Sequence, residues 1–168
     1  MSKITLAIDP GKSGGFAWHH TDNPMIVTGQ LPEEDGGIME WLSDLKNQAD
    51  SVELHIEKVA PHTGNLAMAS AMSNLYGGKR FIEGYAAGIG MRVVNVSPKK
   101  WQKHFSFGPK KKKTVLRKGV EVQVNDEIEW KNRLKSEAKR RFPGIKITLD
   151  NADAVLILDH AMSAPSLL

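Results

Sequence analysis

The segment from Leu149 to Ala161, LDNADAVLILDHA, limits what this chain can fold into more than any other stretch. Residues 152–158 are apolar except for Asp153, and a helix that is hydrophobic nearly all round must be covered by other elements. Asp150 and Asp153 lie three residues apart, a spacing that puts both on one helix face. An acid at a helix start can cap it by accepting backbone N–H groups, which accounts for only one of the two. The segment therefore predicts a buried helix with an acid left for another role.

The hydrophobic pattern of the rest of the chain predicts an α/β domain with a mixed sheet. Alternating apolar residues indicate strands at residues 3–9, 15–20, 25–31, 51–59 and 91–98, with a short further strand at 145–149. Helical spacing of apolar residues indicates helices at residues 33–46, 65–89, 130–142 and 151–162. Gly77 and Gly78 interrupt the longest of these, and each glycine costs about 1 kcal/mol relative to alanine. Close packing or a break is expected there.

Length and composition favour a single domain spanning residues 1–168. The absence of cysteine excludes disulfides and thiolate metal sites, and it fits a reducing compartment. Asp9 lies in the first apolar stretch, which is not typical of a secretory signal, and no apolar run approaches the ~20 residues of a membrane-spanning helix. We therefore expect a cytoplasmic protein with no membrane partner.

The net charge of +4 conceals a strongly basic segment. Residues 97–118 contain nine Lys and Arg and no acid, whereas the remainder of the chain holds 14 basic and 19 acidic residues. At the end of this region and beyond it, residues 114–124 predict a two-stranded ribbon around a Lys118-Gly119 turn. Such a patch is typical of binding to a polyanion, above all nucleic acid. A solvated loop explains the charge equally well.

Two further acids end predicted strands. Asp9 ends the first strand, and Glu57 ends the strand at residues 51–59. If these strands are neighbours and the last helix packs over their ends, both acids meet Asp150 and Asp153. Four like charges resist ionising together, and two Mg²⁺ ions, which prefer oxygen ligands, would neutralise them. Two ions about 4 Å apart suit hydrolysis of a phosphodiester.

The segments AIDPGKSGG, HIEKV and LDNADAVLILDHA resemble the RuvC-type Holliday junction resolvases of the RNase H-like nuclease superfamily. The resemblance is strongest to the shorter phage and viral members of this family. It extends to two further segments, VNVSPKKWQKHF and WKNRLKSEAKRRFPGIKITLDNADA. It implies an RNase H-like mixed five-stranded sheet flanked by helices, into which the basic ribbon is inserted. It also implies a cytoplasmic location in a bacterium or an infected cell.

The resemblance further implies an endonuclease that cuts two opposed strands of a four-way DNA junction, leaving 5′-phosphate and 3′-hydroxyl ends. The catalytic residues, which are also the ligands of two Mg²⁺ or Mn²⁺ ions, fall on Asp9, Glu57, Asp150 and Asp153. Symmetric cutting requires a homodimer, and the helix at residues 65–89 is its expected interface. No small-molecule cofactor is implied.

Basic residues are expected to hold the DNA. Lys99 and Lys100 are expected at the scissile backbone. The residues expected to contact phosphates of a junction arm are Lys110, Lys111, Lys112, Lys113, Arg117 and Lys118. His160 follows Asp153 by two helical turns and either supports the site or is an ordinary histidine at a helix end.

The chain departs from the family in two places, and other functions stay open. Ala60 stands where bacterial members carry an aromatic that stacks into the opened junction, and the ribbon at residues 110–124 is additional to the compact core. The same acids would serve a broader branched-DNA or RNase H-type nuclease. A non-catalytic junction binder is a further alternative. An ATP-binding protein of the actin-like type needs two lobes, and 168 residues accommodate one.

Overall fold

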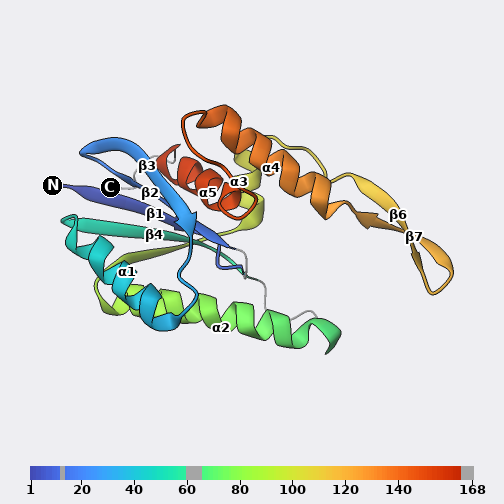
Figure 1. Cartoon of the computed structure of the whole chain (residues 1–168), viewed down its shortest axis with the longest axis horizontal. Helices are drawn as coiled ribbons and strands as arrows, with labels where there is room; N and C mark the ends of the chain where they lie inside the picture. The colour runs from blue at the N-terminus through green and yellow to red at the C-terminus, as the bar shows by residue number, and fades with distance from the viewer. Residues whose placement is uncertain (12–13, 60–65, 164–168) are drawn as a thin grey trace.

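The computed structural model describes residues 1–11, 14–59 and 66–163. A five-stranded sheet forms its centre, with helices on both faces and a separate two-stranded ribbon (Figure 1). The strands are β1 (Lys3–Ile8), β2 (Gly15–His20), β3 (Asn23–Gln30), β4 (Ser51–Glu57), β5 (Arg92–Val96), β6 (Lys112–Arg117) and β7 (Val120–Asn125). The helices are α1 (Asp35–Asn47), α2 (Leu66–Gly88), α3 (Pro98–His104), α4 (Glu127–Arg141) and α5 (Ala152–Ser163).

The sheet is mixed, as the sequence predicts, with strand order β3-β2-β1-β4-β5. β1, β4 and β5 run parallel, whereas β2 and β3 are antiparallel to their neighbours. Ile8 at the end of β1 is in register with Ile56 near the end of β4. Because parallel strands end at the same edge of a sheet, Asp9 and Glu57 are brought to one edge.

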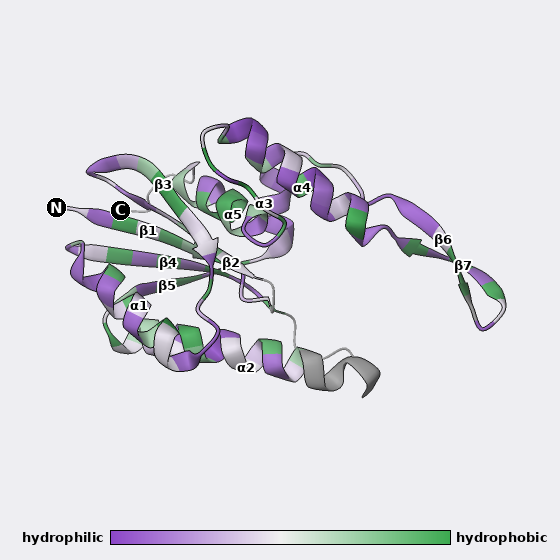
Figure 2. Cartoon of the chain, viewed as in Figure 1, coloured by the Kyte–Doolittle hydropathy of each residue, from purple (hydrophilic) through white to green (hydrophobic). Residues whose placement is uncertain are grey.

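Two hydrophobic cores lie on opposite faces of the sheet. On one face, Ile4, Leu6 and Ile8 of β1 join buried residues of β4, α1 and α2. On the other face, the small residues Ala7 and Ala17 lie opposite each other on β1 and β2. Such small side chains let α5 approach the sheet closely, and residues 152–158 of α5 are all buried. Figure 2 shows the contrast between hydrophobic α5 and hydrophilic α4, which covers it.

Two expectations about local structure are wrong. The helix at residues 66–88 continues through Gly77 and Gly78, and nothing lies within 4 Å of a Cβ added at either glycine. The expected break is therefore absent, and no described residue packs closely on either glycine, whereas close approach of a second copy at Gly78 stays a prediction. Buried Lys79 holds this part of α2 on β5, because its Nζ donates to Glu83 Oε1 at 2.5 Å and to Asn95 Oδ1 at 2.7 Å.

The second wrong expectation is the short strand at residues 145–149, which forms a turn region instead. Asn151 is the physical reason. Its Oδ1 accepts the Thr148 backbone N–H at 2.8 Å, and its Nδ2 donates to the Lys146 carbonyl at 3.1 Å. These local bonds compete with strand pairing for the same backbone groups. The segment therefore fixes the entry of the chain into α5.

The basic segment contains one element that the sequence did not predict and one that it did. Helix α3 begins at Pro98, which is suited to the first position of a helix because it lacks an N–H. The ribbon β6–β7 forms as expected, with left-handed φ angles of 50° at Lys118 and 79° at Gly119 in its turn. Within the described residues, no helix combines the length and apolar character needed to cross a bilayer.

Candidate active site

Asp9 and Glu57 lie side by side where β1 and β4 end. Asp9 follows β1, and its Oδ1 accepts the Gly11 backbone N–H at 3.2 Å. Glu57 is the last residue of β4, and its Oε1 accepts a hydrogen bond of 2.8 Å from Trp101 Nε1. Trp101 is fully buried in α3, so this contact fixes the glutamate from within the core.

Asp153 joins these two acids from the first turn of α5. Its side chain is nearly fully buried, and its Oδ2 accepts a hydrogen bond of 2.6 Å from Lys131 Nζ of α4. Its Oδ1 is buried and has no hydrogen-bond partner among the described residues. We call Asp9, Glu57 and Asp153 the acid cluster. Lys131 is the cation that interacts with each of these three acids.

The ionisation of the acid cluster reflects its burial. Burial raises the pKa of Glu57 to about 7, and the negative charge of Asp9 adds to this effect. Burial also raises the pKa of Asp9, with the charge of Asp153 as the next cause. For Lys131, burial is the largest single cause and acts to lower the pKa, but the combined attraction of Asp153, Asp9 and Glu57 outweighs it and the pKa is raised. The cluster thus holds more negative charge than one lysine compensates.

The acid cluster fits a hard divalent cation in its chemistry. Its members offer carboxylate oxygens only, which Mg²⁺ and Mn²⁺ prefer, and Asp153 Oδ1 is a buried oxygen without a partner among the described residues. Within residues 1–11, 14–59 and 66–163, however, no three His, Asp or Glu side chains are arranged to hold a metal ion directly. The Lys131 ammonium is instead the cation that contacts Asp153.

Asp150, the fourth expected ligand, has a different partner. It lies in the turn before α5, where its Oδ2 accepts a hydrogen bond of 3.1 Å from Gln30 Nε2 at the end of β3. Its backbone N–H donates to Thr148 Oγ1 at 3.2 Å. The structure therefore brings three of the four expected acids together around Lys131, and it holds Asp150 beside them through Gln30.

Gly15 brings the start of α5 against the sheet. A Cβ at this position would lie 2.7 Å from the Gly29 carbonyl oxygen and 2.8 Å from that of Asp150. Both distances are shorter than van der Waals contact, so only glycine fits without displacement. Gly15 O also accepts the Asp9 backbone N–H at 3.0 Å. The glycine thus positions backbone next to two of the expected ligands.

Lys99, Lys100 and His160 lie near the acid cluster without joining it. Both lysines are exposed in the first turn of α3, directly before Trp101. His160 packs against His104 of α3 with ring centroids 5.3 Å apart, and its buried Nδ1 has no partner among the described residues. Burial, followed by the charge of His104, lowers the pKa of His160.

The lysines of the ribbon divide into two groups. Three of them pair with acids around the start of α4: Lys110 with Glu127 at 2.7 Å, Lys111 with Glu129 at 3.2 Å and Lys113 with Asp126 at 3.2 Å. Lys112 and Lys118 are exposed and pair with no acid among the described residues. Arg117 lies in β6, but its side chain is outside the described part, as is the whole of Ala60.

Sequence reasoning missed Lys131, Gln30 and the contact of Trp101 with Glu57. Nothing in the sequence distinguishes Lys131 from Lys135 and Lys139 on the same helix. Each of the three follows a buried residue of α4 by one position, so each lies at the edge of the buried face. The polar contacts link elements that are distant in the sequence, so periodicity could not reveal them.

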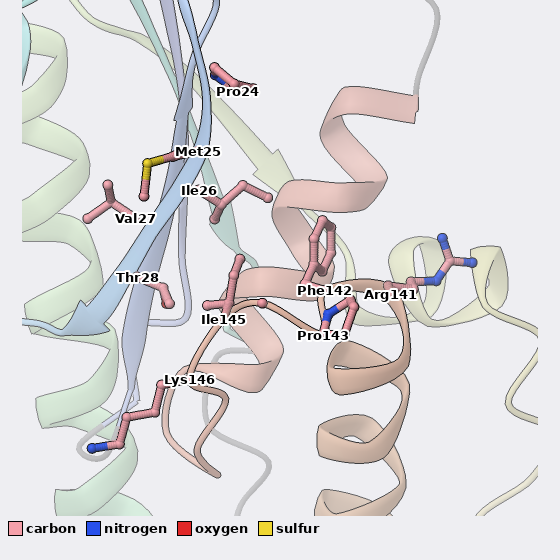
Figure 3. A pocket seen from close by; sticks show the side chains of 11 residues that line it. Pro24, Met25, Ile26, Val27, Thr28, Arg141, Phe142, Pro143, Ile145 and Lys146 are labelled. Atoms are coloured by element: carbon pink, nitrogen blue, oxygen red, sulfur yellow. The ribbon is translucent and has the colours of Figure 1, made fainter.

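A cavity of about 620 Å³ lies apart from the acid cluster. Figure 3 shows Met25 and Ile26 of β3 on one side of it and Phe142 and Ile145 of the α4–α5 connection on the other. None of the expected site residues lines it. We therefore do not assign it to the site.

The arrangement defines an α/β protein with acids gathered at the ends of parallel strands. No model of a known protein family matches the sequence, and no curated protein matches it. Among solved structures, Thermus thermophilus RuvC in complex with a Holliday junction substrate is similar, with a TM-score of 0.51 and 13% identity over 94% of this chain and 92% of that chain. A second structure of Thermus thermophilus RuvC has a TM-score of 0.47 and 16% identity over 94% of this chain and 93% of that chain.

The similarity to the DNA complex establishes the fold. The sheet is mixed, has five strands and is flanked by helices, which agrees with the RNase H-like architecture expected from the sequence. This chain therefore has a RuvC-type fold, and that prediction is confirmed. At 13% identity, the similarity does not by itself assign an activity.

Proposed function

We propose that this chain is a divalent-metal-dependent endonuclease that resolves four-way DNA junctions. The observation that carries the proposal is the acid cluster, with Asp9, Glu57 and Asp153 gathered around Lys131 on a RuvC-type fold. The solved relative in fold is in complex with a Holliday junction. The products would be symmetric paired nicks with 5′-phosphate and 3′-hydroxyl ends.

Each member of the site has a role in this proposal. Asp9, Glu57 and Asp153 would hold two Mg²⁺ or Mn²⁺ ions, together with Asp150 after its release from Gln30. When bound, such ions activate the attacking water and stabilise the leaving oxygen. Trp101 fixes one oxygen of Glu57, which orients the carboxylate. Lys131 stabilises the acids when no metal is bound.

The surroundings of the acid cluster suit DNA and a dimer. Lys99 and Lys100 are exposed two residues and one residue before Trp101, which contacts Glu57, so we expect them to contact a phosphate backbone that enters the site. Symmetric cutting requires two sites related by a two-fold axis. We propose a homodimer through α2, whose Tyr76 is an exposed aromatic.

The test is a substrate panel with a matched pair of variants. The panel comprises a four-way junction, a Y-fork, a linear duplex and an RNA–DNA hybrid, each with Mg²⁺ or with chelator. We expect preferential paired cutting of the junction, and only with Mg²⁺. Asp153→Asn should abolish cutting and retain junction binding, whereas Asp159→Asn on the same helix should cut normally, because Asp159 pairs with Arg141 at 2.8 Å instead. Cutting that persists in chelator contradicts the proposal, and preferential cutting of the hybrid would assign an RNase H-type activity.

A second candidate is a junction-binding protein without catalysis. One observation favours it, because Lys131 already supplies the acid cluster with a cation and no described trio of acids is arranged for a metal. Isothermal titration with Mn²⁺ distinguishes the two functions. A nuclease should bind Mn²⁺ in the wild type and lose this binding in Asp153→Asn, whereas a non-catalytic binder should show no such difference.

A further inference from the structure

The ribbon β6–β7 projects away from the rest of the molecule (Figure 1). Among the described residues, it packs extensively on no other element. Its base is held by the ion pairs of Lys110, Lys111 and Lys113 with the start of α4, and by the Asp126 N–H, which donates to the Lys111 carbonyl at 2.8 Å. The ribbon is thus anchored at one end and free at the other.

The free end exposes large apolar side chains. Leu116 is 71% exposed and Val120 is 63% exposed, on either side of the Lys118-Gly119 turn. Leu116 is in register with Glu121 and Val120 with Arg117, so the two apolar residues lie on opposite faces of the ribbon. Figure 2 shows hydrophobic segments along the ribbon to its far end. Exposed apolar side chains on a projecting element indicate a binding surface.

The geometry of this tip selects the shape of its partner. A flat partner would cover one face of the ribbon and leave the other apolar residue in water. A slot with two walls covers both faces at once. The major groove of duplex DNA is about 12 Å wide and admits a two-stranded ribbon, and its walls carry phosphates at their rims. Lys112 and Lys118, exposed and unpaired within the described residues, supply charge that complements those phosphates.

The length of the ribbon determines how far from the acid cluster the tip would contact a DNA groove. Six residues of β6 span about 20 Å, which equals about six base pairs of duplex. The ribbon joins the start of α4, and Lys131 of the site follows Glu127 by about one helical turn. The strand and this helical turn together span about 25 Å, so the tip is about six to eight base pairs away from a phosphate held at the acid cluster.

We propose that the β6–β7 ribbon is a DNA-binding arm whose tip enters the major groove of a duplex arm, about six to eight base pairs from the cleaved phosphate. Leu116 and Val120 pack on the two walls of the groove, and Lys112 and Lys118 contact its phosphates. This inference rests on the proposed function for its substrate, branched DNA. It adds a contact that the acid cluster does not make.

The experiment is methylation protection on a four-way junction without divalent metal, where no cutting occurs. Dimethyl sulfate modifies guanine N7, an atom in the major groove. The variant is Leu116→Thr with Val120→Thr, because threonine retains strand propensity and both positions are exposed. The control is Ile128→Thr, which removes a side chain that is 69% exposed at the start of α4.

In the wild type and the control, we expect protection of guanines about six to eight base pairs from the cleavage position. The double variant should lose this protection and at least about tenfold in junction affinity, since burying one Leu-sized side chain is worth about that factor. Protection that persists in the double variant, or is absent in the wild type, overturns the arm.

A parallel measurement on linear duplex separates this inference from the proposed function. If the chain does not prefer junctions but the arm exists, the same loss of protection appears on linear duplex. If the chain cuts junctions and the double variant keeps wild-type protection and affinity, the proposed function holds and the arm fails.

Discussion

Lys131 and Asp153 come from different helices, and their contact at 2.6 Å joins α4 to the start of α5. The lysine side chain is 44% exposed, so the pair lies at the surface on one side and against the buried acids on the other. A partly exposed ion pair contributes little to stability by itself. Its importance is that the acid cluster has a compensating charge before any metal binds.

Lys131→Met should make the acid cluster depend on metal. Without the ammonium, the like charges of the acids repel each other, and the chelated protein should melt at a temperature lower by a few degrees, at ~2–4 °C per kcal/mol. Added Mg²⁺ should then raise the melting temperature more than it does in the wild type. Lys139→Met, an exposed lysine on the same helix, is the control. Equal Mg²⁺ responses in all three proteins would contradict the prediction.

Glu57 gives the metal-free protein a dependence on pH. Its pKa of about 7 lies above the ordinary value of 4.5, so the folded state binds more protons than the unfolded state between these pH values. Stability from this group is therefore full below about pH 4.5 and is lost as the pH rises toward 7. Thermal melts in chelator should show a fall across this window. Glu57→Gln should remove this fall in stability, whereas Glu40→Gln, at an exposed position of α1, should retain it.

At the scale of elements, the hydrophobic pattern of the sequence predicts the helices and strands that bury one regular face. It fails where side chains form hydrogen bonds with the backbone. The strands of the central sheet and helix α5 follow from apolar periodicity, and all are confirmed. Residues 145–149 alternate like a strand, but Asn151 and Thr148 bind the backbone there. Helix α3 is short and its lysines conceal its single buried residue, Trp101. Asp9 and Glu57 could be placed together because parallel strands end at one edge, whereas the contacts of Asp150 and Lys131 depend on tertiary packing.

Asn151→Ala should loosen the entry into α5. Asn151 is 5% exposed, and its side chain satisfies the Thr148 N–H and the Lys146 carbonyl. Both bonds are partly buried, and a hydrogen bond of this kind contributes about 0.5–1.5 kcal/mol, so urea unfolding should show a loss of that order for each bond. Asn132→Ala, at an exposed position of α4, should have little effect. An unchanged midpoint for Asn151→Ala would show that the turn is held by other contacts.

At the scale of the whole molecule, the sheet separates the acid cluster from the proposed dimer surface. α3, α4 and α5 cover the face that carries the acid cluster, whereas α1 and α2 cover the other (Figure 1). The basic ribbon leaves from the first side. α2 therefore has a surface that can pair with a second copy while the acid cluster and ribbon remain accessible to DNA.

The proposed homodimer predicts a mass in solution of about 37 kDa, twice the 18.5 kDa of one chain. Tyr76→Glu would place a charge at the exposed aromatic of α2, which is 43% exposed. Sedimentation should then show a monomer, and a junction should receive single nicks instead of paired nicks. Met39→Glu on α1, at a residue 37% exposed, is the control and should remain a dimer. A monomeric wild type that still makes paired nicks would refute the α2 interface.

The tight fit at Gly15 bears on how mutational screens of this chain should be interpreted. A side chain there would push the Asp150 carbonyl away from β2, although glycine has no side chain to offer to metal or nucleic acid. In a saturation screen scored by loss of DNA cleavage, position 15 would rank with the carboxylates. Measuring resistance to proteolysis together with activity would distinguish position 15 from the carboxylates. A bulky residue at position 15 should destabilise the fold, whereas an amide in place of Asp153 should leave the fold intact.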